Sequence, residues 1–204
     1  PDVDREFLSL LDIREIQRVG YIVVTSDRGL AGSFNTNVLK KAQQEIEEIG
    51  KQNVDLFCIG KKARDHFKRR DYNIVQSHIE FWNDLDFPHA MKMGEGIISH
   101  FINGEVDEIH VVYNEFVNIA TQSIQSERLL PIEYDDENRM ALVDRLYEPS
   151  KEKLVRSLIP RHLNIQMWKY LLESYASEQA ARMVAMENAT ENAEDMIKDL
   201  SLEF

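Results

Sequence analysis

The chain has 204 residues, of which 43% are hydrophobic and 29% charged, and its formal net charge is −12. This length and mixture are typical of a globular protein with one α/β domain and an additional element. The acidic balance argues against binding to nucleic acid or adsorption to anionic lipid, because both need clusters of lysine and arginine. No apolar run reaches the roughly 20 residues of a membrane span, and the first residues show no signal-peptide pattern.

Strands and helices alternate over the first two thirds of the chain. The strands are apolar almost throughout, as expected for strands covered on both faces of a sheet. Glycines and a proline stand at the element boundaries where helices stop or start. The predicted elements, in order, are a strand (19–25), a helix (35–49), a strand (53–60), a basic helix (61–70), a short strand (72–77), a helix (88–101) and a strand (106–116).

This order predicts an α/β fold with a Rossmann-like, doubly wound sheet over residues 18–134. β-Branched residues alternating with polar ones over residues 117–133 predict an antiparallel edge strand, paired with the strand before it. Residues 135–150 are interpreted as an acidic, solvated connection, in which residues 141–148 can add a last short strand. The single cysteine, Cys58, lies in an apolar run, so we expect a buried thiol and a reducing, cytoplasmic setting.

A long helix is predicted over residues 151–204. Ser150 is a suitable N-cap, although Lys153 stands where a capping box has glutamate. Pro160 is expected to kink the first turns. Beyond this proline the chain continues for about 44 residues without glycine or proline, far longer than a typical globular helix.

A stripe along this helix advances in alternating steps of four and three residues. This heptad pattern predicts a coiled coil, in which a second helix lies along the stripe. For the first half of the helix, packing on the chain's own domain is the alternative, whereas the second half is too long for that. The residues before the first strand are too few to supply the second helix, so we expect the chain to be a piece of a longer protein. The stripe comprises Leu172, Ala176, Gln179, Met183, Met186, Thr190, Ala193, Ile197, Leu200 and Phe204.

Residues 23–37 have the outline of a phosphate-binding loop, because an apolar strand runs into two glycines and then a helix. Gly29 and Gly32, however, fit neither the dinucleotide fingerprint G-x-G-x-x-G nor the P-loop pattern. Asp27 and Arg28 would crowd a pyrophosphate at this place. We therefore interpret Asp27, Arg28, Gly29 and Gly32 as a structural, contact-making turn, with a nucleotide- or NAD-dependent α/β enzyme as the alternative.

The remaining patterns predict no catalytic, cofactor-binding or metal-binding residues. No two histidines have the helical spacing of a metal pair with a supporting acid, and no nucleophile-elbow motif is present. The helix over 61–70 is interpreted as a solvated face, with docking of an acidic partner as the alternative. Asn35 or Asn37 can satisfy the free N–H groups of the helix after the glycine turn.

Two segments closely resemble the gamma subunit of F-type ATP synthase. They are RVGYIVVTSDRGLAGSFNTN over residues 18–37 and ASEQAARMVAMENATENAEDMIKDL over residues 176–200. The first is similar to the family's opening strand and turn, although Ala31 stands where many members have cysteine. The second is similar to the family's C-terminal helix. The tripeptide LLP at 129–131 and the tetrapeptide YEPS at 147–150 also fit in order.

The resemblance implies a Rossmann-like domain without bound nucleotide, flanked by two helices that wind into an antiparallel coiled coil. Residues 1–17 would be the remnant of a missing N-terminal helix region, and residues 151–204 a truncated C-terminal helix. The implied function is that of a non-catalytic rotor shaft, which transmits torque between a proton-driven c-ring and the catalytic ring. The implied partners are the alpha and beta subunits, the epsilon subunit and the membrane c-ring. The implied location is peripheral, on the cytoplasmic face of the cell membrane.

Individual residues take roles from this resemblance. The α/β domain would be the foot of the rotor, and the turn at Asp27 to Gly32 would contact partners. Glu178 and Arg182 lie four residues apart and can pair along the helix surface, or alternatively reach the stator ring. Unbranched methionines suit a shaft surface that adapts under load. The implied shaft residues are Gln179, Arg182, Met183, Met186, Thr190 and Ile197.

Overall fold

The computed structural model describes residues 9–132 and 151–202, without the side chains of residues 151–156. Its centre is a five-stranded sheet with the strand order β3-β2-β1-β4-β5. The first four strands are parallel, and β5 runs antiparallel to β4, its neighbour in sequence. The predicted doubly wound sheet with an antiparallel edge hairpin is therefore confirmed. The strands are β1 (Val19–Val24), β2 (Val54–Ile59), β3 (Ile74–His78), β4 (Glu108–Asn118) and β5 (Thr121–Leu130).

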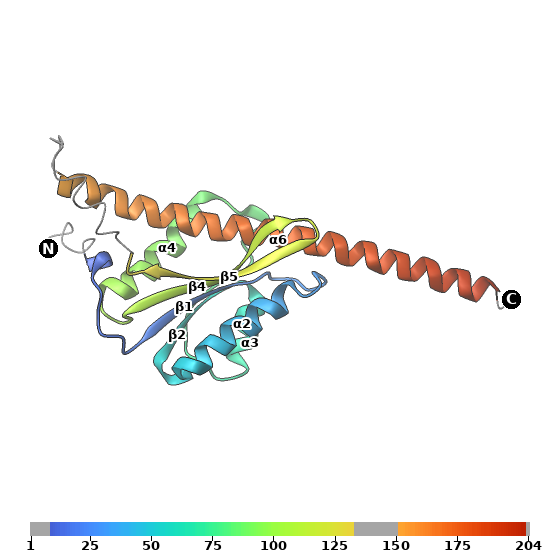
Figure 1. Ribbon diagram of the computed structural model, residues 1–204, viewed down its shortest axis with the longest axis horizontal. Coiled ribbons are helices and arrows are strands. Elements are labelled where there is room, and N and C mark those ends of the chain that lie inside the picture. The colour runs from blue at the N-terminus through green and yellow to red at the C-terminus, as the bar shows by residue number, and fades with distance from the viewer. Residues whose placement is uncertain (1–8, 133–150, 203–204) are drawn as a thin grey trace.

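Helices cover both faces of the sheet (Figure 1). In β1, Tyr21 and Val23 pack against α2 (Phe34–Ile49) and α3 (Lys61–Lys68), whereas Ile22 and Val24 belong to the core under α4 (Phe87–Ile102) and α6 (Lys151–Leu202). All six residues of β1 are buried, because side chains alternate between two covered faces. This is why the strand reads as a continuous apolar run. Among the described residues, the short 3-10 helix η1 (Ser9–Leu11) precedes β1, and η2 (Lys51–Asn53) and η3 (Trp82–Asp84) lie in connections between the longer elements.

The carboxyl ends of the parallel strands are joined tightly. The Thr25 N–H donates to the Ile59 carbonyl (2.8 Å), and the Gly60 N–H donates to the His78 carbonyl (2.8 Å). Gly60 has a φ of +92°, and a Cβ there would lie 2.0 Å from the Thr25 carbonyl oxygen. Only glycine fits such an approach between backbones. The strand ends therefore form a rigid base for the turn that follows β1.

The helix α6 spans 52 residues as one element. Pro160, which was predicted to kink it, lies inside the helix and does not interrupt it. The first part of α6 lies across the sheet, and the rest projects away from the domain (Figure 1). The residues of α6 that are buried against the domain are Ile159, Leu163, Met167, Tyr170, Leu171, Ser174, Ser177, Glu178, Ala180 and Ala181.

The predictions for Cys58 and for the N-terminal segment can be compared with the structure, whereas others concern residues that it does not describe. Cys58 is fully buried, and burial raises the pKa of its thiol to about 12, as expected for an unreactive core cysteine. In the N-terminal segment, Leu10 packs in the core and Arg14 lies over the ring of Phe101. The predicted acidic connection, the short strand within it, the Ser150 cap, Phe204 and residues 1–8 lie outside the described residues.

Candidate functional site

The helix α6 carries two stripes on nearly opposite sides. Successive residues of an α-helix are about 100° apart, so residues two apart point in nearly opposite directions. Ser174 faces the sheet and is 1% exposed, whereas Leu172 faces outward and is 43% exposed. The first half of α6 packs on its own domain, but through a stripe other than the heptad seam. Packing on the domain and an exposed heptad seam therefore coexist on the same helix.

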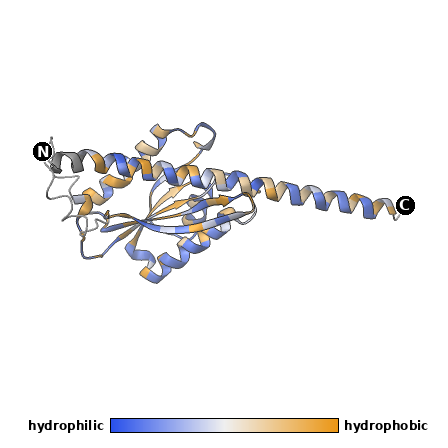
Figure 2. Cartoon of the chain, turned by 45° about the horizontal axis from the view of Figure 1, so that its top comes forward, coloured by the Kyte–Doolittle hydropathy of each residue, from blue (hydrophilic) through white to orange (hydrophobic). Residues whose placement is uncertain are grey.

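The described residues of the heptad seam are exposed, except for Ala176, which is half-buried. Met183 is 51% exposed and Ile197 is 67% exposed, and Gln179 and Thr190 are exposed as well. Figure 2 shows apolar residues recurring along the projecting part of α6 among polar ones. The outward stripe also starts earlier than predicted, since Leu158 and Ile165 are about half exposed and precede Leu172 at intervals of seven residues. None of the described residues covers the projecting part of this seam.

The turn between β1 and α2 is closed by its own side chains. Asn35 Oδ1 accepts a hydrogen bond from the Ser26 N–H (2.9 Å), and the Ser26 hydroxyl donates to the Arg28 carbonyl (2.7 Å). Asn35 was predicted to satisfy the free N–H groups of the following helix. Its side-chain oxygen instead accepts from the N–H of Ser26, which precedes the turn, so this prediction was wrong for Asn35 Oδ1. Leu30 and Gly32 adopt positive φ angles of 61° and 53°, which reverse the chain direction.

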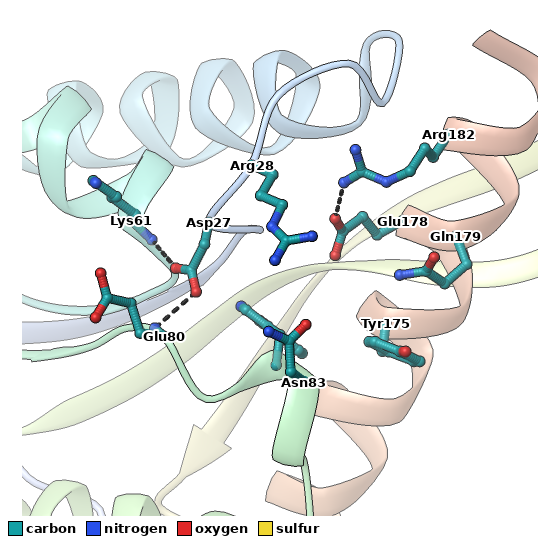
Figure 3. Close-up of a pocket in the computed structure, with 10 residues that line it drawn as sticks. Asp27, Arg28, Lys61, Glu80, Asn83, Tyr175, Glu178, Gln179 and Arg182 are labelled. Atoms are coloured by element: carbon teal, nitrogen blue, oxygen red, sulfur yellow. Dashed lines mark hydrogen bonds and ion pairs between the residues drawn. The ribbon is translucent and has the colours of Figure 1, made fainter. Parts of the chain in front are cut away.

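Asp27 ties this turn to the ends of the two neighbouring strands. Its carboxylate accepts from the Lys61 N–H (2.7 Å) through one oxygen and from the Glu80 N–H (2.7 Å) through the other (Figure 3). Two backbone donors, one at the start of α3 and one in the connection after β3, fix the carboxylate rigidly. This use of Asp27 as a structural anchor agrees with the interpretation of the segment as a built turn.

Arg182 connects the turn to the long helix. Its guanidinium donates to the Gly29 carbonyl (2.7 Å) and forms an ion pair with Glu178 one helical turn earlier. The pairing of Glu178 and Arg182 along the helix is thus confirmed. The contact with Gly29 was not predicted, because 153 residues separate the two positions and no sequence pattern links them. The structure therefore brings the two sets of candidate residues together.

A polar cavity of about 540 Å³ lies between the turn, η3 and α6. Figure 3 shows the Arg28 guanidinium extending between the turn and the helix. The ring of Trp82 stacks with that of Tyr175 at 6.3 Å between centroids. Three acids and three bases line the cavity, so it lacks the positive excess that a pyrophosphate needs. The lining residues are Asp27, Arg28, Lys61, Glu80, Trp82, Asn83, Tyr175, Glu178, Gln179 and Arg182.

The described side chains, those of residues 9–132 and 157–202, form no metal site. No three of them among histidine, cysteine, aspartate and glutamate are placed to hold a metal ion. None of the helices in residues 9–132 and 151–202 is both long and apolar enough to cross a membrane.

Comparisons with known proteins identify the family. A family model described as ATP synthase matches residues 2–204. The ATP synthase gamma chain of Chloroherpeton thalassium is 42% identical over 219 residues, covering 99% of this chain and 72% of that relative. The gamma chain of Prosthecochloris aestuarii is 41% identical and is covered to 71%. This chain belongs to the family of ATP synthase gamma chains. The predicted resemblance is therefore confirmed.

The fold of a gamma chain is also found among solved structures. A chain in the cryo-EM structure of the central stalk and c-ring of the Tetrahymena thermophila mitochondrial ATP synthase superimposes with a TM-score of 0.72. The match covers 93% of this chain and 86% of the other, at 22% sequence identity. The Rossmann-like domain followed by a long helix is thus shared with a chain of that assembly. Which residues of this chain contact partners stays a prediction.

Proposed function

We propose that this gamma chain is the rotor shaft of an F-type ATP synthase. It transmits torque between the c-ring and the catalytic alpha/beta ring, and it forms and breaks no covalent bond itself. The observation that carries this proposal is the division of α6. One part of the helix is packed into the domain, and the other projects from it with an open apolar seam, as a shaft anchored in a foot requires.

A partner helix with basic flanks fits the projecting part of α6. Between residues 187 and 202 the helix carries five acidic side chains and one lysine. Charges beside a coiled-coil seam select the partner, so these acids favour a basic helix and disfavour a second copy of the same tail. More than a quarter of the length of the Chloroherpeton relative lies outside the match, which is enough sequence for such a helix.

The α/β domain acts as the foot in this proposal. It meets the c-ring and the epsilon subunit, while the tail of α6 and the turn at Asp27, Arg28, Gly29 and Gly32 face the alpha and beta subunits. The subunit then lies peripherally, at the cytoplasmic face of the membrane. Torque passes between foot and shaft through the buried stripe of α6 and through the contact of Arg182 with Gly29. Both links are needed, because a projecting helix transmits torque only if its base cannot slip.

The test uses matched charge substitutions in the assembled synthase. Met183→Glu with Ile197→Glu places two charges in the seam, and Asn188→Glu with Asn192→Glu places the same charges on the opposite side of the helix. ATP-driven proton pumping is measured in reconstituted vesicles. The seam variant should lose coupled pumping, and the control variant should retain most of it. Equal behaviour of the two variants would contradict the shaft proposal.

A nucleotide- or NAD-dependent enzyme is not favoured. The Ser26 N–H and the Gly29 carbonyl of the turn are already engaged by Asn35 and Arg182, and the neighbouring cavity has balanced charges. A ligand that binds only the folded state raises the melting temperature. We expect no rise with micromolar ATP, ADP or NAD. A rise with one of them would favour the enzyme instead.

A further inference from the structure

The β4–β5 hairpin contacts one flank of α6. The Phe116 N–H donates to a carboxylate oxygen of Glu173 (2.9 Å), and the Ser177 hydroxyl donates to the Asn114 carbonyl (3.4 Å). These two hydrogen bonds attach the distal part of the hairpin to the helix near residues 173–177. Figure 1 shows the hairpin lying over α6 at the place where the helix leaves the domain.

The tip of this hairpin is apolar and exposed. Phe116 is 37% exposed, Val117 is 54% exposed and Ile119 is 52% exposed. The turn is stabilised by a polar side chain, as is common in turns, because Asn118 Oδ1 accepts a hydrogen bond from the Ala120 N–H (3.0 Å). The conformation of the turn therefore does not require the apolar side chains beside it. Neighbouring exposed apolar side chains are common at contact surfaces.

The position of the hairpin relative to the seam follows from helical geometry. With about 100° per residue, Glu173 points about 40° away from the buried Ser177 on one side and about 60° away from the seam residue Ala176 on the other. An element bound at Glu173 thus borders the seam. On the opposite flank, Gln179 belongs both to the seam and to the cavity beside Arg28. The seam therefore lies between two raised borders, the hairpin and the turn.

We propose that the hairpin tip is a second docking surface for the helix that pairs with the seam. This helix comes from the part of the same gamma polypeptide that the present chain does not cover. It lies on the seam at Leu172 and Ala176 and packs sideways against Phe116, Val117 and Ile119. The inference rests on the proposed coiled coil and adds a third element to it.

Continuity and charge select this occupant. Phe116 of the apolar tip is bonded to Glu173, the residue next to the exposed Leu172, so we expect one helix to cover both surfaces. A second copy of α6 is disfavoured by the acidic residues of the tail. A helix held by α6 alone can roll around it, whereas a helix that also contacts the hairpin is fixed relative to the sheet. The hairpin thereby prevents the shaft from turning independently of the foot.

Site-specific photo-cross-linking in the assembled synthase tests the inference. A benzophenone amino acid is placed at Val117, at Met183 as a reference within the seam, and at Lys40 on the exposed side of α2 as a negative control. The products are mapped by mass spectrometry. We expect positions 117 and 183 to form internal cross-links to gamma residues outside the present 204, and position 40 to form none.

The two proposals fail in distinguishable ways. Internal products at position 183 together with no product at position 117, or with a product joined to another subunit, would overturn the hairpin inference and leave the coiled coil intact. No internal product at either position would overturn both. Val117→Asp with Ile119→Asp should also reduce coupled proton pumping several-fold relative to Thr121→Asp. Pumping equal to that of Thr121→Asp would count against the hairpin contact.

Discussion

Replacing Arg182 by methionine tests how firmly the shaft is fixed to the foot. The substitution keeps a long apolar stem and removes the guanidinium, so the Gly29 carbonyl and the Glu178 carboxylate both lose a donor. A hydrogen bond with a charged partner contributes about 1.5–3 kcal/mol. Removing one member of a buried ion pair costs about 3–5 kcal/mol. The Glu178 side chain is 7% exposed, but that of Arg182 is 24% exposed.

Water that reaches Arg182 reduces these values, and we expect a loss of about 2 kcal/mol in the free energy of unfolding. For a protein of this size the melting temperature falls by about 2–4 °C per kcal/mol, so the expected decrease is about 4–8 °C. The measurement is thermal and urea unfolding of the 204-residue chain, followed by circular dichroism.

A double-mutant cycle identifies the cause of the loss. Glu178→Gln alone removes the charge of the partner, and in the double variant no charge is left buried and unpaired. The double variant should therefore be less destabilised than the sum of the single variants, by about 1–2 kcal/mol. A decrease in melting temperature below about 1 °C for Arg182→Met, or full additivity in the cycle, would refute the reasoning.

Three further outcomes follow from backbone geometry, packing and titration. Gly60→Ala should abolish folding, because its Cβ would lie 2.0 Å from a carbonyl oxygen, whereas Gly104→Ala, at positive φ in open space, should cost only about 1 kcal/mol, as measured by urea unfolding. Leu163, on the side of α6 that faces the domain, is fully buried, so Leu163→Ala should destabilise the chain by about 2–5 kcal/mol, whereas Leu158→Ala, at a half-exposed position, should cost under about 0.5 kcal/mol. A thiol reagent should not react with Cys58 at pH 8 until the chain unfolds. Because burial raises the pKa of Cys58 from 9.0 to about 12, its contribution to stability is complete below pH 9 and should be lost as the pH rises towards 12.

Much of the fold was predictable because local patterns agree with the tertiary arrangement. The apolar run of β1 predicted a strand covered on both faces, and all of its residues are indeed buried. The pairing of β4 and β5 was predicted because the two strands are adjacent in sequence. The order of the parallel strands was not, since nothing in a strand specifies which distant strand lies beside it. The basic helix ends at Lys68 rather than at Arg70, because the chain turns there and the Arg70 N–H donates to the Phe67 carbonyl three residues earlier.

The candidate site was predictable only in parts. Glu178 and Arg182 were recognised as a pair because their spacing is local. The contact between Arg182 and Gly29 and the bond between Glu173 and Phe116 join residues that are 153 and 57 positions apart. Such contacts depend on the angle at which α6 crosses the sheet, and that angle is set by the packing of buried side chains. The sequence pattern within α6 does not specify this crossing angle.

The sequence by itself determined the periodicities of this protein, which are apolar strands, alternating helices and one heptad seam, because these depend only on residues close together along the chain. Its two long motifs also determined the family. Only the tertiary structure decided which side of α6 faces the sheet. From Ser174 onward the buried stripe contains small and polar residues such as Ser177 and Ala181, whose apolar signal is weak, whereas its earlier members, such as Leu163 and Leu171, are strongly apolar. The helix therefore carries apolar residues on two sides, and only its packing on the sheet decides which side is buried and which stays exposed for a partner.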